Sequence, residues 1–310
     1  VQLHDGLLVS APDGGDLMTA VTVLNGNVLA VGHSVDRQPR AWVYAPGDKD
    51  FTPSTVEKDG QGEIEDVATI GSTAVAVGWT GLGTTVRPAV WTSTDGRTWT
   101  LQLPANDFRP GTLIKQLTAI TTTPDNRLLV IARDDRQDKE EGDSTAYTSG
   151  DGKTWLPLQT TGLSGSGPQE VDRLIRTDGT YVALGSVLDG AKRGPAIWTS
   201  TDGAKWDLSP YVPQGQPNLQ GIVRQADGKL LVCGSIGSGE PPPLSCWTQK
   251  PDQSWERWDV TVDDKSPRPV LLYGMFLADQ SIVVVGFGQP KDGKGTNDAS
   301  MWTLKPGTHK

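Results

Sequence analysis

The chain of 310 residues has a net charge of −9 and is 35% hydrophobic, with 37 Gly, 22 Pro and 11 Trp. Its negative charge disfavours non-specific binding to nucleic acid and docking to an anionic membrane. No apolar run approaches the roughly 18 residues that a membrane-spanning helix needs, so membrane insertion is not expected. The many Gly and Pro residues between short apolar runs indicate short strands joined by tight turns.

A unit of strand, hairpin turn, strand, loop and strand recurs six times along the chain. The hairpins carry turn dipeptides such as Asn25-Gly26 and Asp178-Gly179, whose residues tolerate positive φ. After each turn comes a dense apolar run such as Val28–Val31. This second strand ends at a small residue in every unit: Gly32, Gly78, Ala132, Gly185, Gly234 and Gly286. A repeat of this kind predicts an array of similar sheets.

The third strand of each unit ends at an aromatic residue: Trp42, Trp91, Tyr147, Trp198, Trp247 and Trp302. Eight or nine residues later a second aromatic residue follows in five units: Phe51, Trp99, Trp155, Trp206 and Trp255. The sixth unit reaches the end of the chain at this point and therefore lacks a fourth strand. Because Val1–Leu3 is similar to Leu101–Leu103, we expect the N-terminus to supply the missing strand.

These units predict an all-β fold, a six-bladed β-propeller of four-stranded blades in which the N-terminal strand closes the last blade. Closure into a ring protects strand edges that would otherwise aggregate. We expect a single domain, with blades at approximately 16–61, 62–113, 114–167, 168–217, 218–266 and 267–310 plus 1–10. The alternative is a seventh blade that lies outside the sequence.

The turn after the third strand has a recognisable motif in the second, third and fourth units. Ser93-Thr-Asp-Gly-Arg-Thr-Trp99, Ser149-Gly-Asp-Gly-Lys-Thr-Trp155 and Ser200-Thr-Asp-Gly-Ala-Lys-Trp206 resemble the Asp-box of sialidase-like (BNR-repeat) propellers, one residue shorter between Asp and Gly. The resemblance implies a structural role away from any active site. The residues expected to fix the turns are Asp95, Gly96, Trp99, Asp151, Gly152, Trp155, Asp202, Gly203 and Trp206.

The only cysteines, Cys233 and Cys246, fall on neighbouring predicted strands. A disulfide and two buried free thiols are both compatible with this placement. The first alternative implies an oxidising compartment, so a secreted or cell-surface location is expected. No targeting signal precedes Val1, and the absence of an initiator Met suggests a processed or trimmed product.

Catalysis of the sialidase type would require an arginine triad, a Tyr–Glu nucleophile pair and an Asp acid/base, and the Arg-Ile-Pro motif that marks the first arginine is absent. Strand register nevertheless places five polar residues near the channel: Glu65, Asp66, Asp172, Arg173 and Tyr273. Two carboxyl groups at the right separation would suit a glycosidase, whereas polar residues that merely wet a channel are the other explanation. With three His, no phosphate-binding loop and no calcium-loop spacing, we expect no metal and no cofactor.

The loops that join second to third strands, and those that join blades, share one face of a propeller, and functional residues concentrate on such loops. Aromatic and Arg side chains there would suit a protein or carbohydrate ligand. The candidate ligand-binding residues are His33, Trp79, Phe108, Arg109, Arg133, Arg173, Tyr211, Tyr273 and Phe287. We therefore expect a non-catalytic extracellular module that binds a protein or glycan. The alternatives are a sialidase-like exo-glycosidase and a sensor or scaffold domain of a larger surface protein.

Overall fold

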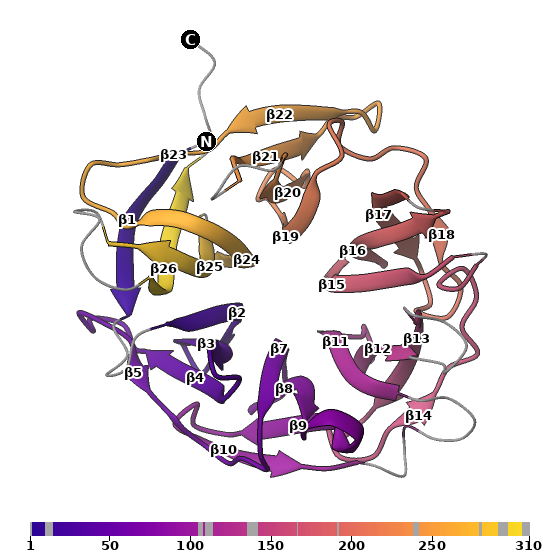
Figure 1. The fold of residues 1–310 in the computed structure, drawn as a ribbon, viewed down its shortest axis with the longest axis horizontal. Coiled ribbons are helices and arrows are strands. Elements are labelled where there is room, and N and C mark those ends of the chain that lie inside the picture. Colours follow the sequence, from indigo (N-terminus) through magenta and orange to yellow (C-terminus); the bar gives the residue numbers. More distant parts are fainter. Residues whose placement is uncertain are drawn as a thin grey trace.

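The computed structural model describes residues 2–9, 15–104, 108, 114–134, 142–165, 167–190, 192–237, 242–278, 281–290 and 297–305. Six antiparallel sheets stand around a central axis like the blades of a propeller (Figure 1). The first strand of each sheet lies innermost and the last lies at the circumference. The predicted six-bladed β-propeller is therefore confirmed.

The first blade consists of β2 (Asp16–Leu24), β3 (Asn27–Ser34), β4 (Pro39–Tyr44) and β5 (Thr52–Pro53). The second consists of β7 (Gly62–Ile70), β8 (Thr73–Thr80), β9 (Arg87–Ser93) and β10 (Thr98–Gln102), with the short 3-10 helix η1 (Gly83–Thr85) between β8 and β9. The third consists of β11 (Ile114–Thr122), β12 (Leu128–Asp134), β13 (Asp143–Ser149) and β14 (Leu156–Pro157).

The fourth blade consists of β15 (Gln169–Thr177), β16 (Thr180–Asp189), β17 (Lys192–Ser200) and β18 (Asp207–Leu208). The fifth consists of β19 (Asn218–Arg224), β20 (Leu230–Ser235), β21 (Leu244–Gln249) and β22 (Trp255–Asp259). The sixth consists of β24 (Arg268–Ala278), β25 (Ser281–Gln289), β26 (Asp298–Lys305) and the N-terminal strand β1 (Gln2–Val9).

The N-terminal strand closes the ring. β1 pairs antiparallel with β26, with Gln2 opposite Lys305 and Val9 opposite Ala299 (Figure 1). The strand lies within residues 1–10, which we assigned to the sixth blade, and extends beyond the three residues whose similarity suggested it. Leu3 is fully buried in the core that the fifth and sixth blades share, so apolar burial as well as hydrogen bonding holds the ends of the chain together.

Segments between blades also extend the sheets at the circumference. β6 (Thr55–Val56) pairs in parallel with β10 of the second blade, and β23 (Thr261–Val262) pairs in parallel with β1 of the sixth. Thr161 forms a similar parallel bridge to Lys205 at the fourth blade. The chain thus runs along the outer edge of these blades before it enters them, and the prediction had assigned the three segments to the preceding blades.

The repeated small residues and aromatics have separate packing roles. A Cβ at the glycine that ends the second strand would lie only 1.8–2.1 Å from a carbonyl oxygen of the inner strand in five blades, as at Gly78 against Glu63 O. Such an approach excludes any side chain. The Trp residues that end the third strands are at most 2% exposed and fill the space between neighbouring sheets.

The Asp-Gly turns have one hydrogen-bond pattern in three blades. In the second blade Asp95 Oδ1 accepts from the backbone N–H groups of Arg97 and Thr98, at 2.8 and 2.9 Å. Ser93 Oγ accepts from Gly96 N, and Trp99 Nε1 donates to Gly96 O. The carboxylates of Asp151 and Asp202 accept equivalent bonds. The φ angles of Gly96, Gly152 and Gly203 lie between +72° and +77°. Residues with a side chain rarely adopt this conformation, so glycine is favoured at this position of the turn.

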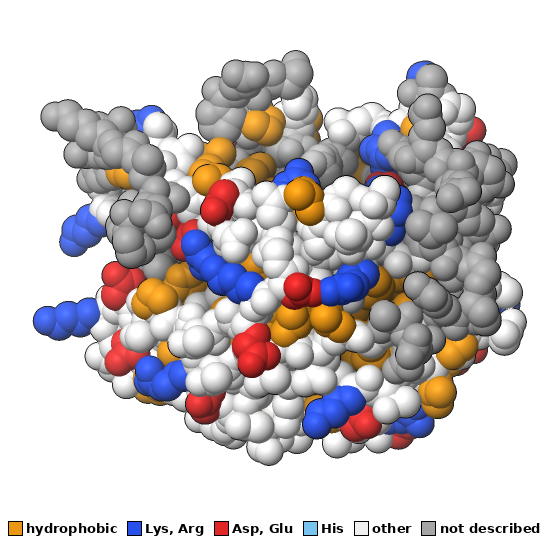
Figure 2. Space-filling model, turned by 60° about the horizontal axis from the view of Figure 1, so that its bottom comes forward, with side chains coloured by type: hydrophobic (Ala, Val, Ile, Leu, Met, Phe, Trp, Pro, Cys, Tyr) orange, Lys and Arg blue, Asp and Glu red, His pale blue; other side chains and the backbone are white. Residues whose placement is uncertain are grey.

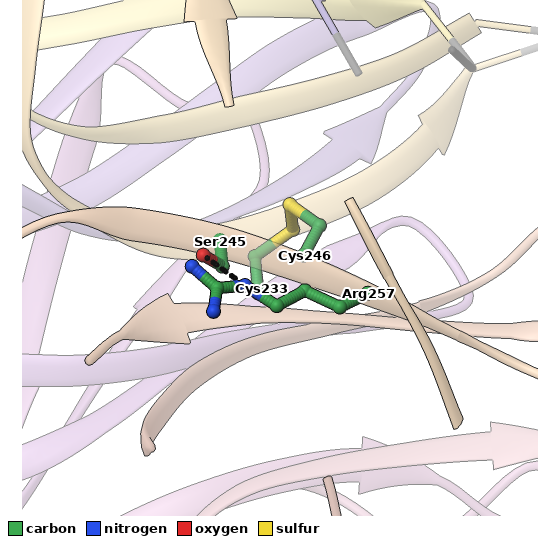
Figure 3. The surroundings of a disulfide bond; sticks show 4 residues. All are labelled: Cys233, Ser245, Cys246 and Arg257. Atoms are coloured by element: carbon green, nitrogen blue, oxygen red, sulfur yellow. Dashed lines mark hydrogen bonds between the residues drawn. A yellow bond between two sulfur atoms is a disulfide. The ribbon is translucent and has the colours of Figure 1, made fainter. Parts of the chain in front are cut away.

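Cys233 and Cys246 form a disulfide between β20 and β21 of the fifth blade, where they are directly opposite each other (Figure 3). Both are fully buried. On the adjoining strand, Arg257 Nε donates to Ser245 Oγ at 3.2 Å (Figure 3). The structure therefore selects the disulfide from the two alternatives that the sequence left open.

On the face shown in Figure 2, acidic and basic side chains are interspersed and hydrophobic side chains occupy small areas between them. Within the described ranges, no helix is long and apolar enough to cross a membrane.

Candidate functional site

At one common point, each inner strand has an extra residue that disrupts its pairing with the second strand; β11 and β24 also have a second register shift, at Lys115 and Val270. The register shifts at the same point in all six blades, and a β-bulge of this kind redirects the side chain of the unpaired residue. The six bulge residues are Thr19, Glu65, Thr118, Asp172, Gln220 and Tyr273. All six are polar, although the strands around them are largely apolar.

The bulge residues of the first, third and fifth blades are buried, at 2%, 9% and 7% exposure. Thr19 Oγ1 donates to Ile64 O of the second blade, and Thr118 Oγ1 donates to Val171 O of the fourth, both at 2.6 Å. In these two blades the bulge residue therefore joins its own blade to the next one. Gln220 occupies the same position in the fifth blade.

The bulge residues of the second, fourth and sixth blades, Glu65, Asp172 and Tyr273, are only half-buried. The Arg173 guanidinium lies 5.6 Å from the centroid of the Tyr273 ring, so side chains of the fourth and sixth blades meet. Together with Asp66, the residue after Glu65, these side chains form what we call the channel cluster: Glu65, Asp66, Asp172, Arg173 and Tyr273. Of the five residues that we expected near the channel, Asp66, Arg173 and Tyr273 line the channel cavity, and Glu65 and Asp172 interact electrostatically with Arg173.

The pKa of Glu65 is raised to about 7, mainly by burial and in part by the neighbouring Glu63 carboxylate, against the lowering effect of Arg173. Burial also raises the pKa of Asp66 to about 6, against the opposing effects of Arg173 and of two backbone N–H groups that donate to the carboxylate, from Ile120 and Val67. The pKa of Asp172 is raised by burial, and that of Tyr273 likewise. Near neutral pH, Glu65 can therefore act as a hydrogen-bond donor as well as an acceptor.

A cavity of about 310 Å³ occupies the channel, with contributions from the inner strands of all six blades. Asp66, Arg173 and Tyr273 form its polar end, and it continues past Thr69 and Thr122 to Arg176. These residues belong to the second halves of the inner strands. The cavity therefore lies toward the hairpins that join first to second strands, not toward the loop face on which we expected a ligand.

The aromatic residues predicted for the loop face are mostly not available to a ligand. Trp79 is 6% exposed and Phe108 is 2% exposed, so both side chains are buried rather than presented to a ligand. Trp79 Nε1 donates to Glu63 Oε2, and the Arg37 guanidinium of the preceding blade lies 5.7 Å from the Trp79 ring centroid. Phe108 packs edge-on against Tyr147, with ring centroids 4.7 Å apart.

The other predicted residues fall in separate places. Tyr211 is 47% exposed. His33 and Phe287 are half-buried on second strands, and Arg133 forms an ion pair with Glu170. Arg173 and Tyr273 belong to the channel cluster, whereas Arg109 lies outside the described residues. The structure thus unites only two of the nine predicted ligand-binding residues at the channel.

The described residues hold no group of three or more His, Cys, Asp or Glu side chains that could bind a metal ion. The chemistry that the channel cluster offers is therefore hydrogen bonding, charge and proton exchange. The sequence analysis did not identify the alternation between buried and half-buried bulge residues. The one signal that could have revealed the bulges is a polar residue within each otherwise apolar inner strand.

No protein-family model and no curated protein matches the chain. Among solved structures, it is similar to a protein of unknown function from Dyadobacter fermentans, with 16% identity over 96% of this chain and 97% of that one, and a TM-score of 0.70. It is similar to the GH93 α-L-arabinofuranosidase of Fusarium graminearum in complex with arabinobiose, with 16% identity over 98% of both chains and a TM-score of 0.67.

A third similar structure is the sialidase of Trypanosoma rangeli in complex with the inhibitor DANA, with 12% identity and a TM-score of 0.65. The match covers 98% of this chain but 58% of the sialidase. At these identities the comparisons establish architecture and not activity. The chain therefore shares the six-bladed propeller fold of the sialidase-like and GH93 arabinofuranosidase structures.

Proposed function

We propose that this protein binds a saccharide in its central channel without hydrolysing it. The observation that carries the proposal is the convergence of three channel-cluster side chains, Asp66, Arg173 and Tyr273, on a cavity whose volume, about 310 Å³, lies within the range of small-ligand sites. A carboxyl, a guanidinium and a phenol together supply the donors and acceptors that sugar hydroxyl groups require. Similar propellers that process saccharides support this ligand class.

Hydrolysis is the second candidate function. It is favoured by the pKa of Glu65, because a carboxyl that stays protonated to about pH 7 can act as a general acid. A glycosidase also needs a second carboxylate that remains charged. Burial raises the pKa values of Glu65, Asp66 and Asp172, so each of these carboxyl groups loses its proton less readily than it would in water. Binding needs no charged carboxylate, so we place it before catalysis.

We also propose where the protein is located, on the evidence of its disulfide. The disulfide between Cys233 and Cys246 is stable in an oxidising compartment, which supports a secreted or cell-surface protein. A propeller domain of this kind can act alone or as the sensor part of a larger surface protein.

A glycan array and a panel of fluorogenic glycosides, which includes an arabinofuranoside and a sialoside, test the proposal. We expect binding without turnover, and a loss of affinity of at least about tenfold in Arg173→Gln and Tyr273→Phe. Asp207→Asn, an exposed carboxylate on the outer strand β18, is the control and should bind normally. Hydrolysis that Glu65→Gln abolishes would favour the second candidate. Binding that neither channel variant affects would place the site elsewhere and contradict the proposal.

A further inference from the structure

A second cavity, of about 470 Å³, lies between the third and fourth blades. The third blade contributes the hairpin between β11 and β12, and the fourth blade contributes the start of β16 and the Asp-Gly turn that follows β17. Among the described residues, none lines both this cavity and the channel cavity. The second cavity is therefore a separate candidate site, of a size that suits a small ligand.

Tyr181 is a buried side chain in the wall of this cavity. It is only 4% exposed, and its ring lies 6.3 Å from that of Trp206. No residue that the structure describes forms a hydrogen bond with its hydroxyl group. At the equivalent position, opposite the serine of the Asp-Gly turn, the second and third blades have Ala74 and Leu128. Packing here therefore needs no hydroxyl group, and a buried polar group without a partner is rare in proteins.

Two carboxylates lie near the Tyr181 hydroxyl group. Burial raises the pKa of Tyr181, while Arg176 lowers it. The carboxylates of Asp125 and Asp202, which line the same cavity, also raise it. The pKa of Asp125 is lowered chiefly by a hydrogen bond from Thr123, and that of Asp202 chiefly by backbone N–H donors. Near neutral pH the cavity therefore presents a neutral phenol beside two ionised carboxylates.

The carboxylate of Asp202 uses only one of its oxygens in the Asp-Gly turn. Oδ1 accepts from the backbone N–H groups of Ala204 and Lys205. In the third blade the other oxygen of the equivalent Asp151 accepts from Thr154 Oγ1, at 3.4 Å. The fourth blade has Lys205 in place of that threonine, so the turn offers no hydroxyl group to Asp202 Oδ2. This oxygen is therefore available as an acceptor at the cavity.

Arg127 brings a positive charge to the third-blade side of the cavity. Its Nε donates to Thr148 Oγ1 at 3.3 Å, and its charge lowers the pKa of Asp125. Within the part of the chain that the structure describes, its two Nη groups donate no hydrogen bond and join no ion pair. The apolar side chains of Pro124 and Leu129 also line the cavity. The site thus combines charges of both signs with an apolar surface.

We propose that this cavity binds a free α-amino acid with an aliphatic side chain. The Arg127 guanidinium would pair with the α-carboxylate, because its planar fork matches that group. The α-ammonium has three donors, of which one would bind Asp202 Oδ2 and another the Tyr181 oxygen. Pro124 and Leu129 would contact the aliphatic side chain. A ligand with only one of the two charges would leave either the guanidinium or the carboxylate unmatched. The proposal does not depend on the function proposed for the channel.

Isothermal titration with L-leucine, isocaproate, isoamylamine and L-arabinose at constant ionic strength tests the proposal. Isocaproate lacks the ammonium group of leucine, isoamylamine lacks the carboxylate, and arabinose is a neutral sugar. We expect leucine to bind and the other three to bind at least about tenfold more weakly. Arg127→Gln should weaken leucine binding about tenfold, because the partner of the carboxylate is lost. The matched control is Arg97→Gln, an exposed arginine in the Asp-Gly turn of the second blade, which should bind leucine normally.

Tyr181→Phe separates a binding role of the hydroxyl group from a structural one. The variant keeps the ring beside Trp206 and loses no hydrogen bond to a described residue, so its melting temperature should be unchanged or slightly higher. Leucine binding should weaken about fivefold. A lower melting temperature with unchanged leucine binding would show that the hydroxyl group is structural and would overturn its role.

Three further outcomes would overturn the proposal. The first is no binding of leucine at millimolar concentration. The second is binding of isocaproate or isoamylamine as tight as that of leucine, since the site would then not recognise both charges. The third is arabinose binding that Tyr181→Phe weakens, which would identify a sugar as the ligand. Arg173→Gln should leave leucine binding unchanged, so failure at the channel is distinguishable from failure here.

Discussion

The odd-numbered and even-numbered blades have the same β-bulge but use it differently. In the first and third blades a short hydroxyl side chain is buried and hydrogen-bonds to the next blade. In the second, fourth and sixth blades a longer ionisable side chain takes that position and remains half-buried at the channel. The residue after the bulge also differs between odd and even blades. It is small in the odd blades (Ala20, Ala119 and Gly221) but charged in two even blades (Asp66 and Arg173).

This difference shows how one structural repeat can provide contacts between blades and also place ionisable side chains at the channel. A bulge weakens strand pairing locally and therefore needs compensation. In the odd blades the compensation is an inter-blade hydrogen bond. In the even blades the polar group lies half-buried near the channel, and burial raises the pKa values of Glu65 and Asp66 there. Four predictions test this division of roles.

The largest effect is expected when the buried acid of an even blade becomes neutral. The pKa of Glu65 is raised from 4.5 to about 7, so the folded state prefers the protonated form. The stability that protonation provides is complete below the unfolded pKa and is lost as the pH rises through about 7. Glu65→Gln removes this dependence, and the variant should match the wild type near pH 4.5 yet be more stable by about 3 kcal/mol near pH 8.

Urea unfolding of the wild type and Glu65→Gln across this pH range measures the difference. Asp207→Asn controls for the loss of a carboxylate at the surface. A gap between wild type and Glu65→Gln that does not grow with pH would mean that Glu65 is solvated as in the unfolded chain, and the contrast between even and odd blades would lose its electrostatic basis.

The fifth blade tests whether an odd blade without a complete Asp-Gly turn needs another constraint. In the turn of this blade, Gln253 adopts a left-handed conformation at the position where three other blades have Gly. The disulfide lies in the sheet of the same blade. Replacement of Cys233 and Cys246 by Ala should lower the free energy of unfolding by roughly 2–3 kcal/mol, because the bond closes a loop with a sequence separation of 13. An unchanged urea midpoint would show that packing alone holds this blade.

The inter-blade hydrogen bonds of the odd blades should contribute less individually. Thr19→Val and Thr118→Val keep the shape of the side chain but remove the donor, so each should destabilise the protein by about 1–2 kcal/mol. Saccharide binding in the channel should be unaffected. Thr→Ser at either position retains the hydroxyl and should recover most of the stability. If the Val variants lost binding instead of stability, the odd-numbered bulges would belong to the site.

The repeat and its aromatic positions were sufficient to predict the six blades and their closure by the N-terminus. The similarity that suggested β1 covers only three residues, whereas its pairing with β26 continues to Val9, within the residues 1–10 assigned to that blade. The parallel strands β6 and β23 were missed because two residues carry no periodicity signal. The disulfide depended on strand register, which the sequence restricted but did not determine.

The site was less predictable than the fold. The sequence placed Glu65, Asp172 and Tyr273 near the channel, but their approach to one another depends on residues from blades that are far apart in the chain. The burial of Trp79 depends on Arg37 and Glu63, and Arg37 comes from the preceding blade. A local sequence pattern does not reveal a contact between blades. The burial of an aromatic residue proposed for the loop face, such as Trp79, could therefore not be predicted.

The smallest effect is expected at the Asp-Gly turns, which even and odd blades share, unlike the bulge residues that alternate between them. Backbone N–H donors lower the pKa values of Asp95 in an even blade, Asp151 in an odd blade and Asp202 in an even blade. Their contribution to stability is present above the unfolded pKa of 3.8 and is lost as the pH falls through the lower folded values. Replacement of each Asp by Ala should lower the free energy of unfolding by about 1 kcal/mol near neutral pH, as the loss of other side-chain caps of backbone N–H groups does. The loss should be smaller in acid. Because this turn does not contact the channel, the cost should be equal in odd and even blades. A clear difference between Asp95→Ala and Asp151→Ala in urea unfolding would show that the alternation extends to the circumference.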